Sequence, residues 1–100
     1  MPLDRESILM ALSANRKMLD HYGVRNIRLF GSFARSEEAP GSDVDLLVEF
    51  EPTAQIGLFE FIRLKNALGE ILSCKVDLVT PNALHKGMKD EILKEAIRAA

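Results

Sequence analysis

The chain has 100 residues, of which 47% are hydrophobic and 28% are charged, and its formal net charge is −2. These values exclude a disordered chain and predict one small folded domain that spans residues 1–100. The slightly acidic balance argues against direct nucleic-acid binding, because nucleic-acid-binding domains usually carry a basic patch. Cys74 is the one cysteine, which excludes an intramolecular disulfide, and no apolar run approaches the ~20 residues that cross a bilayer. We therefore expect a cytoplasmic protein with no membrane partner.

The first third of the chain predicts a helix followed by a strand. Apolar residues recur near helical spacing over residues 4–22, and Asp4 or Ser7 can cap the start of this helix. Gly23 can end it in the left-handed conformation that commonly follows a helix. The apolar run over residues 24–30 then predicts a strand.

A short helix is expected over residues 32–37, and a loop rich in proline, glycine and serine over residues 38–42. The run that follows, residues 43–51, alternates between polar and apolar residues except at Leu47 and predicts a second strand. One face of this strand carries Val44, Leu46, Val48 and Phe50, and the other carries Asp43, Asp45, Leu47 and Glu49. A slip by one residue would bury the aspartates, so the register of this strand is well specified.

The second half predicts a long helix over residues 54–72 with Thr53 as its cap, a third strand over 75–79 and a last helix over 89–98. The residues of the long helix expected to face the core are Leu58, Phe61, Ile62, Leu68, Ile71 and Leu72. We also assign the phenylalanines at positions 30, 33, 50, 59 and 61 to the core.

The connections predict an α+β fold of order α-β-(short α)-β-α-β-α, with a three-stranded mixed sheet and helices packed on it. The short link between strands one and two favours antiparallel pairing, and the helix between strands two and three favours a right-handed parallel crossover. With that topology, the end of strand one and the starts of strands two and three share one edge of the sheet. We therefore expect Gly31 and Ser32, Asp43 and Asp45, and Asp77 to meet there.

This set of residues predicts a site for a metal ion and a phosphate. Asp43 and Asp45 project from the same face of a strand, and carboxylate oxygens suit a hard cation such as Mg²⁺. Three carboxylates in one place repel each other, and a metal ion relieves that repulsion. The backbone amides of a Gly31-Ser32 turn suit a phosphate. The plainer alternatives are that Gly31 and Ser32 only cap a helix, and that Asp77 is only an exposed strand residue.

Two further residues are candidates for contact with the phosphates. Arg35 lies one helical turn after Ser32 and could neutralise phosphate charge, or it could be an exposed helix residue. Ser42 precedes Asp43 and could orient its carboxylate, or it could only form the turn.

The motifs at residues 29–35 (Leu-Phe-Gly-Ser-Phe-Ala-Arg), 42–48 (Ser-Asp-Val-Asp-Leu-Leu-Val) and 76–79 (Val-Asp-Leu-Val) resemble the nucleotidyltransferase superfamily of DNA polymerase beta. The resemblance is most specific to the minimal nucleotidyltransferases (MNT), the antitoxins of HEPN–MNT (HepT/MntA-type) toxin–antitoxin pairs. It covers nearly the whole chain. One departure is Ser36, where the family usually has glycine.

The resemblance implies a Mg²⁺-dependent enzyme that transfers AMP from ATP to a tyrosine hydroxyl of a cognate HEPN ribonuclease toxin and thereby neutralises it. Asp43, Asp45 and Asp77 would be the catalytic metal ligands for two Mg²⁺ ions, and Asp77 would serve the attacking group. Gly31 and Ser32 would bind the nucleotide phosphates, with Arg35 and Ser42 as further candidates. At 100 residues the chain has no room for an acceptor-binding domain, so a partner must present the acceptor.

Two alternatives remain open at the level of sequence. The first is a non-catalytic antitoxin, a binding module that blocks its partner by association alone. The second is the donor subunit of a two-chain nucleotidyltransferase that modifies a small molecule.

Overall fold

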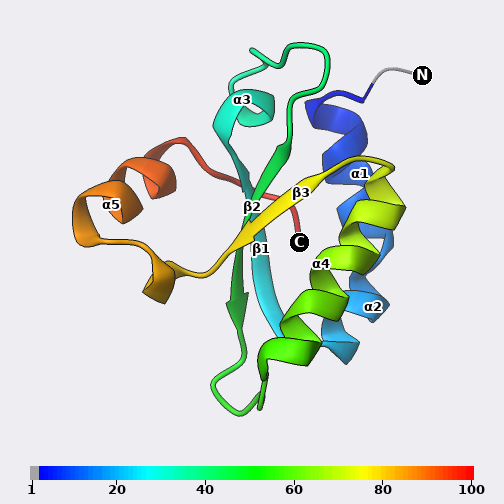
Figure 1. Ribbon diagram of the computed structural model, residues 1–100, viewed down its shortest axis with the longest axis vertical. Coiled ribbons are helices and arrows are strands. Elements are labelled where there is room, and N and C mark those ends of the chain that lie inside the picture. Colours follow the sequence, from blue (N-terminus) through cyan, green and yellow to red (C-terminus); the bar gives the residue numbers. More distant parts are fainter. Residues whose placement is uncertain (1–2) are drawn as a thin grey trace.

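The computed structural model describes residues 3–100 (Figure 1). Over these residues, four strands form one mixed sheet in the order β3-β2-β1-β4. The strands are β1 (Val24–Phe30), β2 (Val44–Phe50), β3 (Val76–Val79) and β4 (Ile97–Arg98). The helices are α1 (Arg5–Ala14), α2 (Arg16–His21), α3 (Gly31–Ala34), α4 (Leu58–Leu72) and α5 (Lys86–Glu95), with a 3-10 turn η1 at Pro81–Ala83. The α+β class and the predicted order of elements up to β3 are confirmed.

The sheet pairs its first three strands as the connection lengths predict. β1 and β2 are antiparallel, with Phe30 opposite Asp45. β2 and β3 are parallel, with Asp45 opposite Asp77. The end of β1 and the starts of β2 and β3 therefore lie at one edge of the sheet.

The fourth strand corrects the prediction of a three-stranded sheet and of a last helix over residues 89–98. α5 ends at Glu95, and the chain then extends so that β4 pairs antiparallel with β1, with Ile97 opposite Leu29. The pairing continues beyond β4, because the Ile27 amide donates to the Ala100 carbonyl at 3.0 Å. The free edge of β1 carries unpaired backbone groups, and satisfying them favours an extended segment over a longer helix.

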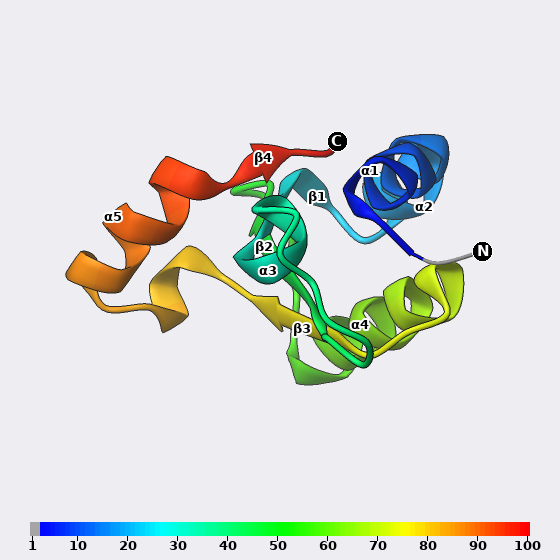
Figure 2. The ribbon, with the colours of Figure 1, turned by 90° about the horizontal axis from the view of Figure 1, so that it is seen from above.

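The helices lie in two layers. α1, α2 and α4 cover one face of the sheet, and α5 stands on the other side (Figure 2). The core lies between the first layer and the sheet, and its fully buried side chains include Ile8, Leu12, Leu19, Ile27, Leu29, Val44, Leu46, Val48, Leu64 and Leu68. The alternation predicted for β2 is confirmed on this face. Leu47, on the opposite face, is buried as well.

The first helix is broken at Asn15, where a continuous helix over residues 4–22 was expected. The Asn15 side-chain amide donates to the Ala11 carbonyl at 2.7 Å, a local bond that competes with the helical ladder. Asp4 is the cap of α1, and it exchanges hydrogen bonds with Ser7 in a capping box. No helix in the described part of the chain is long and apolar enough to cross a membrane.

α4 begins at Leu58, with Gly57 as its cap, so the predicted start at residue 54 and the cap at Thr53 are wrong. Leu64, Leu68 and Leu72 follow each other at four-residue spacing and form its buried stripe. Phe61 and Ile71 flank this stripe half-buried, and Leu68 and Leu72 are buried as predicted. Three side chains that were predicted to be buried lie off this stripe, so the prediction is wrong for them. Leu58 is 71% exposed, Phe59 77% and Ile62 43%.

Candidate active site

The turn at Gly31 is built around the side chain of Asp45. β1 ends at Phe30, and Gly31 adopts a left-handed φ of +76° as it begins α3. A Cβ atom added to Gly31 would lie 3.0 Å from Cγ and 3.2 Å from Cβ of Asp45, and closer still to Oδ2. Only glycine satisfies both the backbone angle and this close approach.

The three predicted aspartates lie on neighbouring strands at the same edge as this turn. Asp43 immediately precedes β2 and is exposed, Asp45 is half-buried within β2, and Asp77 is exposed on β3. Asp45 and Asp77 are partners in the parallel register, and adjacent strands lie about 4.8 Å apart. The structure therefore brings the Gly31 turn and the carboxylates together, as the pairing rules predicted.

Several negatively charged side chains act on the Asp45 carboxylate. Burial raises the pKa of Asp45 above its ordinary value, and the charges of Asp77 and then Asp43 raise it further. The Arg35 guanidinium lowers the pKa of Asp45, and the Glu95 carboxylate raises it. The ionised cluster therefore lacks sufficient positive charge, and a bound cation would supply it.

The donor atoms of this cluster fit Mg²⁺, which takes oxygen ligands. Within residues 3–100, however, no three His, Cys, Asp or Glu side chains lie close enough together to hold a metal ion as they stand. Mg²⁺ usually binds through one or two carboxylates, with waters and substrate phosphates as its remaining ligands, so the cluster does not need three side chains on one ion.

The residues expected to contact phosphate lie in and after α3. Ser32 is half-buried in the first turn, and its carbonyl accepts from the Glu37 amide at 2.8 Å. Arg35 caps the end of α3 and is exposed. Its Nη1 atom donates to both carboxylate oxygens of Glu95, at 3.2 and 2.9 Å, and its Nε atom donates to Glu37 at 3.2 Å.

Glu95 was not predicted as a site residue. Its Oε1 atom also accepts from the Gly31 amide at 3.1 Å, so one carboxylate engages two of the groups that were assigned to phosphate. Glu95 lies 64 residues after Gly31, and the apolar pattern around it predicts only a helix. No local motif marks it, so the tertiary structure alone reveals it.

Ser36 and Ser42 shape the loop between α3 and β2. Ser36 adopts a left-handed φ of +55°, a conformation that favours glycine. The Ser42 hydroxyl accepts from the Ala39 amide at 2.9 Å, and its own amide donates to the Ala39 carbonyl at 3.0 Å. This geometry agrees with the turn-forming alternative for Ser42, and its contact with phosphate stays a prediction.

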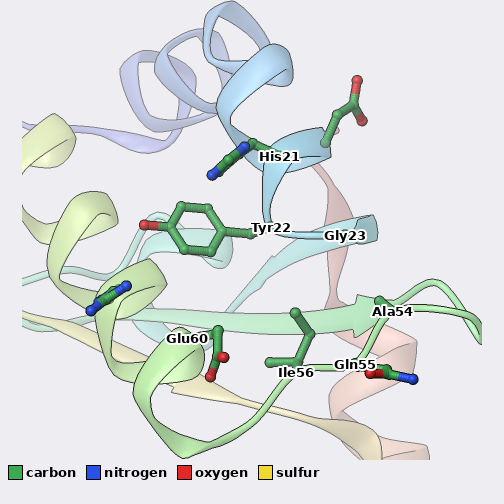
Figure 3. A pocket seen from close by; sticks show the side chains of 9 residues that line it. His21, Tyr22, Gly23, Ala54, Gln55, Ile56 and Glu60 are labelled. Atoms are coloured by element: carbon green, nitrogen blue, oxygen red, sulfur yellow. The ribbon is translucent and has the colours of Figure 1, made fainter.

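A separate pocket lies near the opposite end of β1 and β2, where Val24 pairs with Phe50 (Figure 3). It is lined by Asp20, His21, Tyr22, Gly23, Ala54, Gln55, Ile56, Glu60 and Arg63. The His21 and Tyr22 rings meet edge to face, with centroids 5.4 Å apart. None of the predicted site residues lines this pocket, so it is distinct from the aspartate cluster.

Comparison with known proteins agrees with this geometry. The model of the nucleotidyltransferase domain family matches residues 12–99. Protein adenylyltransferase MntA of Thermococcus cleftensis is 40% identical over 96 residues, which cover 95% of each chain.

Solved structures share the fold. One named provisionally as a minimal nucleotidyltransferase aligns with a TM-score of 0.80 and 36% identity over 95% of both chains. A tri-AMPylated HEPN toxin of Shewanella oneidensis in complex with its MNT antitoxin aligns with a TM-score of 0.66 and 18% identity, over 93% of this chain and 71% of that one. At that identity the second likeness shows the fold alone. The family match over most of the chain, together with the identity to MntA, shows that this protein is an enzyme that belongs to the nucleotidyltransferase domain family.

Proposed function

We propose that this protein transfers AMP from ATP to a tyrosine hydroxyl of a cognate HEPN toxin and thereby acts as its antitoxin. The hydroxyl oxygen forms a bond to the α-phosphorus as the bond from that phosphorus to the α–β bridging oxygen breaks, and pyrophosphate leaves. The observation that carries the proposal is the meeting of the Gly31 turn with Asp45 and Asp77 at one edge of the sheet. The name of the related MntA and the S. oneidensis complex supply the nucleotide and the class of partner. We also propose that the protein is cytoplasmic, because ATP is available there as the donor.

In this proposal Asp43, Asp45 and Asp77 hold two Mg²⁺ ions. When bound, the metal would neutralise the charge of the triphosphate and of the carboxylates, and would favour the deprotonated hydroxyl. Asp45, half-buried against the Gly31 turn, positions the centre of the cluster. Asp77 is exposed on β3, the edge strand next to β2, so an acceptor hydroxyl can approach it and transfer its proton to the Asp77 carboxylate.

The phosphates are assigned to the other side of the cluster. The Gly31 amide and the Ser32 hydroxyl are hydrogen-bond donors at the turn, and Arg35 supplies a positive charge one turn further on. In-line transfer needs the phosphate held between these donors and the carboxylates, which the close approach of Gly31 to Asp45 permits.

The partner is expected to supply the acceptor. The helices and strands of residues 3–100 build the donor half of the site, and Asp77 is exposed on β3. A toxin that docks there would place its own hydroxyl against Asp77, and association and catalysis would depend on different residues.

Intact-mass spectrometry of the cognate HEPN toxin tests the proposal. The toxin is incubated with ATP, Mg²⁺ and either the wild type or the Asp45→Asn variant. We expect the mass of one or more adenylyl groups with the wild type and none with Asp45→Asn. Asp20→Asn, an exposed aspartate paired only with Arg16 across one helical turn, is the matched control and should behave as the wild type.

An antitoxin that acts by association alone is the second candidate. It is favoured by the Glu95 carboxylate, which occupies the Gly31 amide that the nucleotide phosphates would need. Neutralisation of the toxin by both the wild type and Asp45→Asn, without a change of mass, would establish this candidate. A two-chain transferase for a small molecule would leave the toxin unmodified and unneutralised.

A further inference from the structure

The carboxylate of Glu95 is bound by three hydrogen bonds at the start and end of α3. Its Oε1 atom accepts from the Gly31 amide at 3.1 Å and from Arg35 Nη1 at 3.2 Å, and its Oε2 atom accepts from the same Nη1 at 2.9 Å. A backbone amide and a guanidinium that converge on two oxygens of one anion form an arrangement that serves carboxylates and phosphates alike.

The same two donors are assigned to the triphosphate in the proposed function. The Gly31 amide has a single hydrogen to donate, so it cannot hold Glu95 and a phosphate oxygen at once. Glu95 also adds a negative charge beside Asp45, at the place where a polyphosphate has to bind. A nucleotide that uses these donors must therefore displace the Glu95 carboxylate.

α5, the helix that carries Glu95, buries little of its surface against the rest of the fold. Every residue of α5 is half-buried or exposed, and Met88 and Leu93 are among the exposed large apolar side chains. α5 projects to the side of the sheet away from α1, α2 and α4, and it is connected to the sheet through β3 and η1 at its start and through the two-residue strand β4 at its end (Figures 1 and 2). Segments with few buried contacts open at low free-energy cost.

We propose that Glu95 is a built-in competitor of the nucleotide triphosphate, which occupies the Gly31 amide and Arg35 until ATP–Mg²⁺ displaces it and α5 shifts away from α3. This inference rests on the proposed function of Gly31 and Arg35 as phosphate-binding groups. It assigns the nucleotide-free protein a self-blocked state, in which the affinity for polyphosphate is lowered by the competition with Glu95.

Calorimetric titration of the full chain tests the competition. The probes are a non-hydrolysable ATP analogue with Mg²⁺, and inorganic tripolyphosphate with Mg²⁺, which lacks the base and the sugar. We expect Glu95→Gln and Glu95→Ala to bind both probes more tightly than the wild type, by roughly two- to fivefold, the upper part of the range expected from an exposed ion pair. Glu91→Gln removes an equal charge one helical turn earlier on α5 and should change neither affinity by more than about twofold.

The amide resonance of Gly31 gives a readout that does not depend on activity. In the wild type it should shift when Glu95 is replaced by glutamine, and tripolyphosphate with Mg²⁺ should bring the wild type and the variant to the same position. A Gly31 resonance that is indifferent to Glu95→Gln would overturn the inference, since the contact would then be missing in solution.

The outcomes separate this inference from the proposed function. If the wild type binds the probes and the Glu95 variants bind them equally or more weakly, the competition is refuted while the proposed function stands. Weaker binding would assign Glu95 to holding the metal or Arg35 in place. If neither the wild type nor the variants bind either probe, both proposals fail together.

Discussion

Gly31 and Asp45 approach each other so closely that no side chain fits at position 31. An added Cβ would lie 3.0 Å from the carboxylate carbon of Asp45, and the backbone there has a φ of +76°. The turn that we assign to phosphate and the carboxylate that we assign to metal are thus one structural unit, and a change at either residue should disturb both.

Replacing Gly31 by valine should weaken binding of the ATP analogue far more than Ser32→Ala does. The valine side chain would strain the left-handed backbone and displace the Asp45 carboxylate, whereas Ser32→Ala removes one hydroxyl, worth about 0.5–1.5 kcal/mol. Calorimetric titration in the presence of Mg²⁺ measures both affinities. Gly41→Val is the matched control, because Gly41 also has a positive φ, of +84°, but an added Cβ there meets no atom within 4 Å. Equal losses in the Gly31 and Gly41 variants would contradict a role of the turn in binding.

Asp45→Asn should abolish AMP transfer and raise the thermal stability of the metal-free protein. The pKa of Asp45 is raised in the fold, so its charged form opposes folding at neutral pH, and asparagine removes that cost. The gain in melting temperature should be largest near pH 7 and should vanish as the pH falls below 3.8, the ordinary pKa, because Asp45 is then neutral in both states. Thermal melting of the wild type and the variant in a chelating buffer across this pH range measures the difference in melting temperature and its sign. A variant that melts below the wild type at pH 7 would refute the electrostatic account.

Asp77→Asn should abolish the adduct on the toxin while association with the toxin persists. Asp77 is exposed at the sheet edge and is placed to serve the attacking hydroxyl, whereas partner surfaces gain affinity mainly from apolar and rim contacts. Intact-mass spectrometry and co-purification with the toxin measure the two properties separately. Wild-type adduct formation by this variant would remove Asp77 from the catalytic set.

Ser36→Gly should stabilise the protein by roughly 0.5–1 kcal/mol. Ser36 has a left-handed φ of +55°, and glycine adopts this conformation without the steric cost of a Cβ. Urea unfolding measures the change. Ser13→Gly is the control of opposite sign, because Ser13 lies exposed within α1, where glycine costs about 0.5 kcal/mol relative to serine.

Leu64→Ala should lower the free energy of unfolding by about 2–4 kcal/mol, because Leu64 is fully buried on α4. Leu58→Ala, on the same helix but 71% exposed, should change the free energy of unfolding by no more than about 0.5 kcal/mol. Urea unfolding compares the two variants directly. Similar losses would mean that the exposed apolar side chains near the start of α4 are covered in solution.

The sequence by itself determined the part of the fold that depends on local physics. The alternation of polar and apolar residues in β2, broken only at Leu47, set which face carries Asp43 and Asp45, and the lengths of the connections set one antiparallel and one parallel pairing. These rules suffice to bring Gly31, Asp45 and Asp77 to one edge. The residue motifs likewise predicted the family that the comparisons show.

Only the tertiary structure decided the features that depend on distant partners. β4 forms because the edge of β1 offers unpaired backbone groups to a segment some 70 residues later in the chain, which helical propensity around residues 89–98 does not reveal. The packing of α4 against the rest of the fold likewise decides which of its side chains are buried. Leu58 and Ile62 have apolar side chains, but they lie outside the core. Glu95 meets the Gly31 amide across 64 residues, and such a contact has no periodic signature in sequence, because it arises from the packing of α5 against α3.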